Sequence, residues 1–117
     1  MVKVVATSEF EEWFLALDQK DGRAVARVVG LLEMKGVSLG FPYSSAIEGS
    51  RHALRELRVQ SGGHPLRVFY LFDPDRQAVL LIGGDKTNDK RFYQTMIPTA
   101  ETIWQQYLLD RGVGGER

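Results

Sequence analysis

The residues best suited to chemistry in this chain are three cations, Arg58, Arg67 and Lys86. An arginine side chain holds a phosphate group through two parallel hydrogen bonds, so cations that share one surface predict a site for such an anion. The alternative interpretation is that all three are solvated charges on the open face of a sheet. Which of the two holds depends on the strands that carry them.

Alternation of side-chain character predicts three strands around these cations, over residues 56–60, 66–72 and 78–82. If Gly62 and Gly63 close a hairpin, Ser61 pairs with His64, and counting back sets Arg58 directly opposite Arg67. Like charges that face each other across a sheet are unfavourable. A sequence that keeps them, with no acid at either position, favours a site that receives an anion.

The turn over residues 73–76 has proline at its second position, as a type I turn prefers. Counting residues outward from this turn sets Arg67 opposite Ile82. Lys86, four residues after Ile82, then lies on the same face of the sheet as Arg67. The same alternation sends Arg55 to the face opposite Arg58. We expect the Arg67 side chain to face the open side of the sheet rather than the core.

The flanking sequence predicts helices and completes an α+β fold. Ser8 and Glu11 form a capping box for a first helix that ends near Gln19, and Asp21 caps a second helix that Gly36 ends. A two-residue link predicts that these helices form an antiparallel pair. A strand over residues 2–6, a short strand around residues 46–47 and a last helix starting at Pro98 follow from the same patterns.

Composition predicts one domain over residues 1–117. The chain has no cysteine, its start is too short for a signal sequence, and no apolar run reaches the length of a membrane span. A soluble, cytoplasmic protein is therefore expected. The formal net charge is zero, which argues against binding of duplex nucleic acid by overall electrostatics. The positive charge is local, because only residues 51–91 carry a net excess of cations, +3.

Several motifs, in this order along the chain, resemble the phage-derived branch of the RelE/HigB toxin superfamily. They are Leu39-Gly40-x-Pro42, Gly49-Ser50-Arg51, Arg55-Glu56-Leu57-Arg58, Arg67 before an apolar strand, Phe72-Asp73-Pro74-x-Arg76, Gly84-Asp85-Lys86 and Ile97-Pro98-x-Ala100. The resemblance implies a small RelE-like domain, with an antiparallel sheet of about four strands against two N-terminal helices and a C-terminal helix.

The resemblance also implies a function. It is that of a type II toxin-antitoxin toxin that cleaves messenger RNA, usually on the ribosome, without a metal or cofactor. The cognate antitoxin would be a helix-turn-helix protein encoded next to it. The implied catalytic residues are Arg58, Arg67, Lys86 and Tyr93, and Arg51 and Arg55 are candidate contacts to the RNA backbone. A lysine crowded by arginines can have its pKa lowered towards proton acceptance. Two alternatives remain open, a ParE-like gyrase inhibitor without catalysis and a degenerate toxin kept as a binding module.

The general base is not identified by the resemblance. Some ribonucleases of the superfamily use a carboxylate and a histidine near the last strand, whereas this chain offers Asp85 and no histidine beyond His64. Asp85 is expected to orient Lys86 or Arg67, or to cap the helix that follows.

Overall fold

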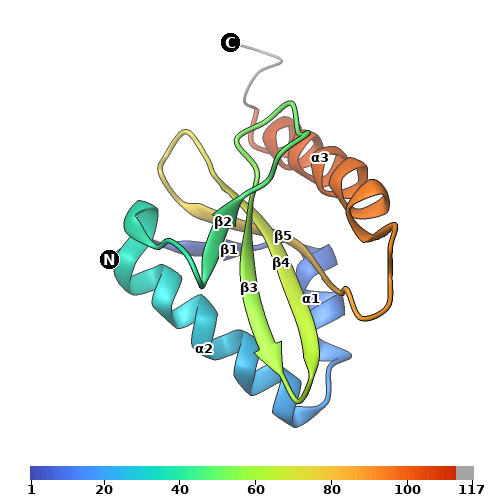
Figure 1. The fold of residues 1–117 in the computed structure, drawn as a ribbon. Coiled ribbons are helices and arrows are strands. Elements are labelled where there is room, and N and C mark those ends of the chain that lie inside the picture. The colour runs from blue at the N-terminus through green and yellow to red at the C-terminus, as the bar shows by residue number, and fades with distance from the viewer. Residues whose placement is uncertain (113–117) are drawn as a thin grey trace.

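A computed structural model describes residues 1–112 and contains one mixed sheet flanked by helices (Figure 1). The elements in chain order are β1 (Val4–Ala6), α1 (Ser8–Leu15), α2 (Gln19–Lys35), the 3-10 helix η1 (Gly36–Ser38), β2 (Ser44–Ala46), β3 (Arg55–Ser61), β4 (His64–Phe72), β5 (Ala78–Asp85) and α3 (Phe92–Asp110). The α+β class is confirmed. The sheet has five strands in the order β1-β5-β4-β3-β2, and β1 pairs parallel with β5, so the expected antiparallel sheet of about four strands is corrected.

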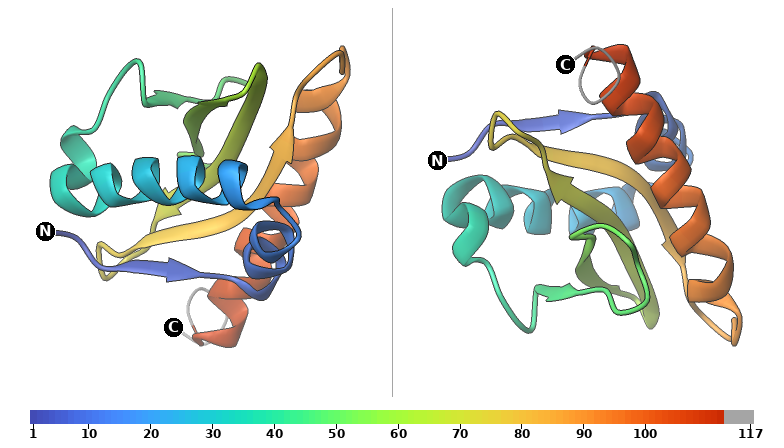
Figure 2. Two further views of the ribbon diagram at one scale, coloured as in Figure 1. Left: turned by 90° about the horizontal axis from the view of Figure 1, so that it is seen from below. Right: turned by 90° about the horizontal axis from the view of Figure 1, so that it is seen from above.

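Helices cover both faces of the sheet. The helices α1 and α2 pack on one face and α3 packs on the other, as the two views in Figure 2 show. Successive residues of β4 therefore alternate between two cores: Val68 and Tyr70 face α2, whereas Phe69 and Leu71 face α3. The face that carries Arg67 is consequently covered by α3, and the expectation of an open face for this side chain is wrong.

The central meander confirms the predicted hairpin. Ser61 pairs with His64 and Arg58 pairs with Arg67. Gly62 and Gly63 adopt φ values of 54° and 85°, which a two-residue hairpin turn of this kind requires of both central residues.

The pairing of β4 with β5 differs from the prediction by two residues. Arg67 lies opposite Gly84 rather than Ile82 for two reasons: the turn is one residue longer than predicted, with Phe72 paired to Ala78, and the register shifts by one more residue between Phe69 and Tyr70. Tyr70 pairs with Leu80, so β5 has one residue more than β4 at this point. An extra residue in one strand is a β-bulge, which parity counting from the turn cannot detect.

The helix starts also differ from the predicted caps. Thr7, not Ser8, caps α1 and accepts a hydrogen bond from the amide of Phe10 at 3.1 Å. Asp18, not Asp21, caps α2. The predicted end of α2 at Gly36 is confirmed, with φ of 55°. In the left view of Figure 2, α1 is seen end on where α2 is seen from the side, so the two are not an antiparallel pair.

The last helix begins before its proline. We expected Pro98 to start this helix, but α3 runs from Phe92 and contains Pro98 in its second turn. Proline at that position forgoes one backbone hydrogen bond. Burial of Phe92 against the sheet fixes the first turn in spite of this loss.

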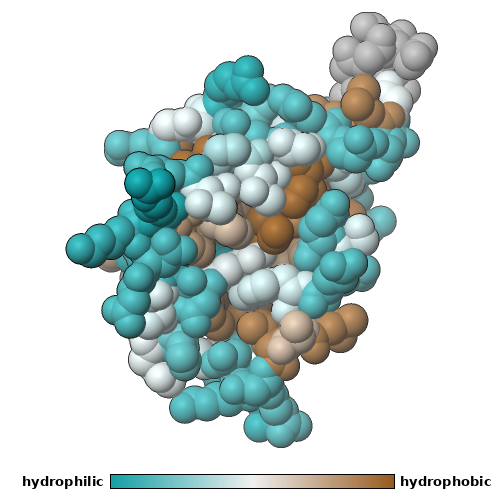
Figure 3. All heavy atoms as spheres, turned by 90° about the vertical axis from the view of Figure 1, so that its right-hand side faces the viewer, coloured by the Kyte–Doolittle hydropathy of each residue, from teal (hydrophilic) through white to brown (hydrophobic). Residues whose placement is uncertain are grey.

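The surface mixes hydrophilic and hydrophobic residues. In the view of Figure 3, hydrophobic patches are separated by hydrophilic side chains. Within residues 1–112, the helices are all too short or too polar to cross a bilayer.

Replacing Gly83 with alanine should destabilise the fold. A β-carbon at Gly83 would lie 2.3 Å from ring atoms of Trp13, so α1 would have to move from the sheet. We expect urea unfolding to show a loss of about 1–3 kcal/mol or more in the free energy of unfolding. Gly30→Ala is the matched control, because nothing lies within 4 Å of the added carbon and α2 should gain about 0.5–1 kcal/mol. Equal effects of the two substitutions would contradict this packing.

Candidate functional site

The structure brings four of the six sequence-predicted residues together. Arg58 and Arg67 are paired on β3 and β4, and the Lys86 ammonium nitrogen lies 5.2 Å from the centre of the Tyr93 ring. The Tyr93 hydroxyl donates to Glu56, which also contacts both arginines. These five residues, Glu56, Arg58, Arg67, Lys86 and Tyr93, are termed the basic cluster.

Glu56 is the residue that sequence reasoning missed. Its side chain is 6% exposed, and the carboxylate accepts hydrogen bonds from Tyr93 at 2.7 Å, from Ser45 at 3.0 Å and from the Arg58 Nη1 at 3.3 Å. The same carboxylate lies 3.5 Å from the Arg67 Nε. The signal was available, because a residue two before Arg58 on the same strand must share its face. Glu56 thus offsets the repulsion of the two facing arginines.

Arg67 is buried beside a small hollow. The side chain is 7% exposed and its Nη1 donates to the carbonyl of Leu66 at 3.0 Å. Gly84 opposite has no side chain, and this lets Phe92 of α3 approach, since a β-carbon there would lie 2.8 Å from the Phe92 ring. A hollow of about 140 Å³ reaches Arg67 and Arg58. The hollow is therefore a candidate site for a small anion beside the two arginines.

The surroundings of the basic cluster shift two pKa values in opposite directions. Burial, then the charges of Arg67 and Arg58, lower the pKa of Lys86, and Glu56 opposes them. Burial, then the hydrogen bond to Glu56, raise the pKa of Tyr93. Lys86 therefore gives up its proton more readily than an ordinary lysine, while Tyr93 remains protonated over a wider pH range.

The other two predicted residues lie outside the basic cluster. The Arg55 Nε donates to the Ser44 hydroxyl at 3.1 Å and to the Tyr70 hydroxyl at 3.3 Å, on the face that α2 covers. Arg51 is exposed, and its backbone amide donates to Glu101. Alternation thus placed Arg55 correctly, and neither residue is positioned beside the paired arginines.

Asp85 neither orients the cations nor caps α3. Its carboxylate accepts from the Thr87 hydroxyl and lies 3.2 Å from His64 at the hairpin end. The hydrogen bond from Thr87 is the largest cause that lowers the pKa of Asp85. The first turn of α3 has no side-chain cap. Both roles expected for Asp85 are therefore wrong.

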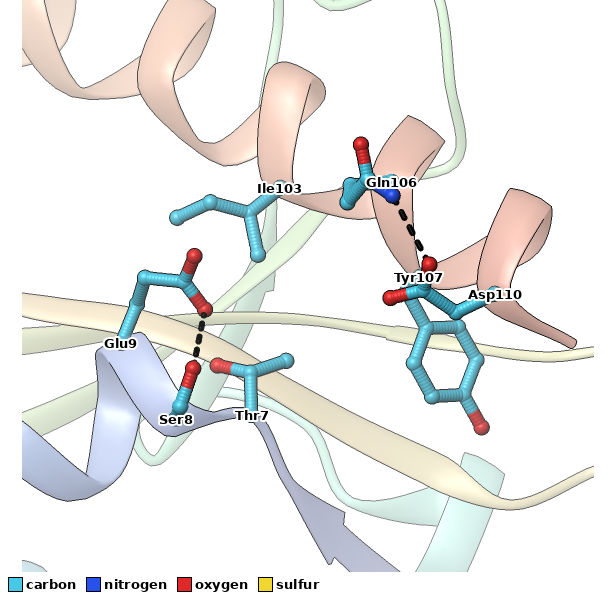
Figure 4. A pocket seen from close by; sticks show the side chains of 7 residues that line it. All are labelled: Thr7, Ser8, Glu9, Ile103, Gln106, Tyr107 and Asp110. Atoms are coloured by element: carbon cyan, nitrogen blue, oxygen red, sulfur yellow. Dashed lines mark hydrogen bonds between the residues drawn. The ribbon is translucent and has the colours of Figure 1, made fainter.

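A separate hollow lies between the start of α1 and α3 (Figure 4). It holds about 310 Å³ and is lined by residues 7–9 together with Ile103, Gln106, Tyr107 and Asp110. It offers two carboxylates and no cation, and Ser8 and Gln106 already donate to Glu9 and Asp110. Across the described residues, no three histidine, aspartate or glutamate side chains gather as a metal site would require. The basic cluster is the better candidate for chemistry on an anion.

Sequence comparisons with known proteins indicate one class, phage-derived proteins related to HigB toxins. The family described as "Phage derived protein Gp49-like" matches residues 12–105. A Mycobacterium tuberculosis protein named "Putative toxin HigB3" is 39% identical over 114 residues, which cover 96% of this chain and 98% of that protein. A second, "Putative toxin HigB2" from the same organism, is 33% identical over 99 residues, 82% of this chain and 49% of that protein.

A solved structure also shows similarity. The solution structure of the conserved hypothetical protein HP0894 from Helicobacter pylori has 22% sequence identity and a TM-score of 0.45, and covers 73% of this chain and 94% of that one.

The chain belongs to the Gp49-like family of phage-derived proteins, because the family matches most of its length. The similarity to the HigB proteins over 96% and 82% of the chain confirms the resemblance that the ordered motifs predicted.

Proposed function

We propose that this protein is the toxin of a type II toxin-antitoxin pair and that it cleaves messenger RNA on the ribosome. The observation that carries the proposal is the basic cluster, in which two arginines border one hollow with a lysine and a tyrosine beside them. The names of the two similar HigB proteins support the toxin assignment. A gyrase inhibitor acting by binding alone has no need of such a cluster.

The proposed reaction uses the 2′-hydroxyl of the substrate as nucleophile. Its oxygen forms a bond to the adjacent phosphorus while the bond from phosphorus to the 5′-oxygen breaks. The products are a 2′,3′-cyclic phosphate and a 5′-hydroxyl end, so no water or metal is consumed in the step. Arg58 and Arg67 would hold the phosphate and stabilise the charge that develops on its oxygens.

Lys86 and Tyr93 are suited to the two proton transfers. Lys86, with its lowered pKa, would accept the proton of the 2′-hydroxyl. Tyr93, with its raised pKa, stays protonated and would supply the proton to the leaving 5′-oxygen. This assignment fills the role of general base that the sequence left open, and uses neither Asp85 nor a histidine.

The proposal implies particular partners. A cognate antitoxin, a helix-turn-helix protein encoded beside this gene, would neutralise the toxin in the cytoplasm. The messenger RNA and the ribosome would be its targets. One domain, residues 1–117, would suffice for these contacts.

Lys86→Ala should reduce cleavage of RNA by about 10²- to 10⁴-fold, the usual contribution of a positioned acid or base. Lys90→Ala is the matched control, since it removes an exposed lysine four residues away. With the native protein, the rate should rise with pH as Lys86 loses its proton and should level off below the ordinary lysine value of 10.5. In Lys86→Arg this rise should disappear. Rates are measured on ribosome-bound message, and on free RNA where that is cut.

The test in cells examines messenger RNA and chromosomal DNA after expression of the protein is induced. Primer extension on an abundant transcript should reveal cuts with cyclic phosphate ends within minutes, while the chromosome stays intact. Double-strand breaks with uncut messages would replace the nuclease proposal with gyrase inhibition. If neither cut messages nor broken DNA is observed, the remaining interpretation is a binding module without catalysis.

A further inference from the structure

An exposed aromatic ring lies against the basic cluster. Phe41 belongs to the loop between η1 and β2 and is 77% exposed. The Arg58 guanidinium carbon lies 5.2 Å from the centre of its ring. A single exposed apolar side chain is ordinary on a protein surface, but this ring lies over a cation of the basic cluster and is accessible to a molecule bound there.

The Arg58 guanidinium lies over the Phe41 ring, which gives a cation–π contact. The high exposure of the residue leaves most of its surface accessible to another flat group. An arginine-backed aromatic ring is the type of platform on which unpaired nucleobases stack.

The position of the ring relates it to the phosphate hollow. The hollow that reaches Arg58 and Arg67 is also lined by Pro42, the residue next to Phe41. Arg58 thus takes part in both features, through its contact with the ring and through the wall of the hollow. A phosphate bound there would have the base of one flanking nucleotide within reach of the loop.

We propose that Phe41 is the stacking platform for the base that flanks the phosphate held by Arg58 and Arg67 in single-stranded RNA. This inference rests on the proposed function, since it names a substrate contact of the same site. Stacking tolerates any base, because every base has a flat face. Phe41 therefore contributes affinity and register rather than sequence preference.

A larger groove continues from the same point. It holds about 500 Å³ between α2 and β3 and shares Pro42, Arg58, Val59 and Gln60 with the small hollow. Arg27 of α2 lies on its wall and offers a further cation to the next phosphate. The two cations on this groove, Arg27 and Arg58, favour an occupant with an anionic backbone, and we therefore take RNA as the occupant.

The test measures the affinity for a labelled single-stranded RNA of mixed sequence that carries 2′-O-methyl groups and so cannot be cleaved. Phe41→Ala should weaken binding about 5- to 150-fold, the range for loss of one stacked base. Phe41→Trp should retain binding, and its added fluorescence should be quenched by RNA. Leu15→Ala, which truncates an equally exposed apolar side chain on α1, should bind as the native protein does.

The remaining outcomes separate this inference from the proposed function. If Arg67→Ala loses RNA binding while Phe41→Ala binds as tightly as the native protein, the stacking role is overturned and the proposed function stands. If Phe41→Ala weakens only the binding of the antitoxin, the ring belongs to a protein interface and the inference is likewise overturned. Native protein that neither binds nor cleaves RNA would overturn both.

Discussion

Arg67→Ala should abolish growth inhibition while the protein still folds. The substitution removes one of the two guanidinium groups at the phosphate hollow, so the charge that develops during cleavage loses a stabilising partner. The fold should lose about 1–2 kcal/mol, less than for most broken buried ion pairs, because Glu56 keeps Arg58, Tyr93 and Ser45 as partners. Growth after induction and the melting temperature are the two measurements.

Two variants complete the Arg67 experiment. Arg67→Lys keeps the charge but not the planar pair of donors, and should remain largely inactive. Arg23→Ala removes an exposed arginine from α2 and should be as toxic as the native protein. A folded Arg67→Ala protein with full toxicity would refute the assignment of the basic cluster.

Glu56→Ala should produce the largest loss of stability, about 3–5 kcal/mol in the free energy of unfolding measured with urea. It leaves two facing arginines without their shared carboxylate and a half-buried tyrosine hydroxyl without its acceptor. Glu56→Gln keeps the shape and the acceptor oxygen, and should lose less. Glu48→Ala, at an exposed acid, should change stability by about 0.5 kcal/mol at most.

A double-mutant cycle tests whether Glu56 and Arg67 act as a pair. The combination of Glu56→Ala with Arg67→Ala should cost less than the sum of the two, with a coupling energy of about 0.5–3 kcal/mol. Additive losses would show that the carboxylate does not stabilise Arg67, and would leave the like-charge pairing unexplained.

The arginine pair could be predicted from the sequence because it depends only on local geometry. Two adjacent glycines define the hairpin, and the strand period then fixes which residues face each other. The residue of β5 that pairs with Arg67 could not be predicted in the same way. The bulge after Phe69 arises where β4 and β5 pack between two cores, and no turn residue signals it.

The burial of Glu56 and Arg67 was missed for a different reason. Helical spacing is already present at Tyr93 and Met96. We expected Pro98 to start the last helix, however, and so did not expect the preceding turn, with Phe92 and Tyr93, to lie on the sheet. Without that turn, the face that carries Arg67 is expected to be open, and nothing distinguishes Glu56 from an ordinary strand residue. The burial of Arg67 and the role of Glu56 both depend on tertiary packing.

The parallel pairing of β1 with β5 imposes an order on folding during synthesis. Val4–Ala6 leave the ribosome early but must wait for Ala78–Leu80 before they have a partner. Closing so long a loop slows folding, because its entropy must be lost before the pairing is gained. Tyr93 follows later still, so a nascent chain holds Arg58 and Arg67 without the helix that covers their face of the sheet. We therefore expect the basic cluster to be complete only after α3 has been translated.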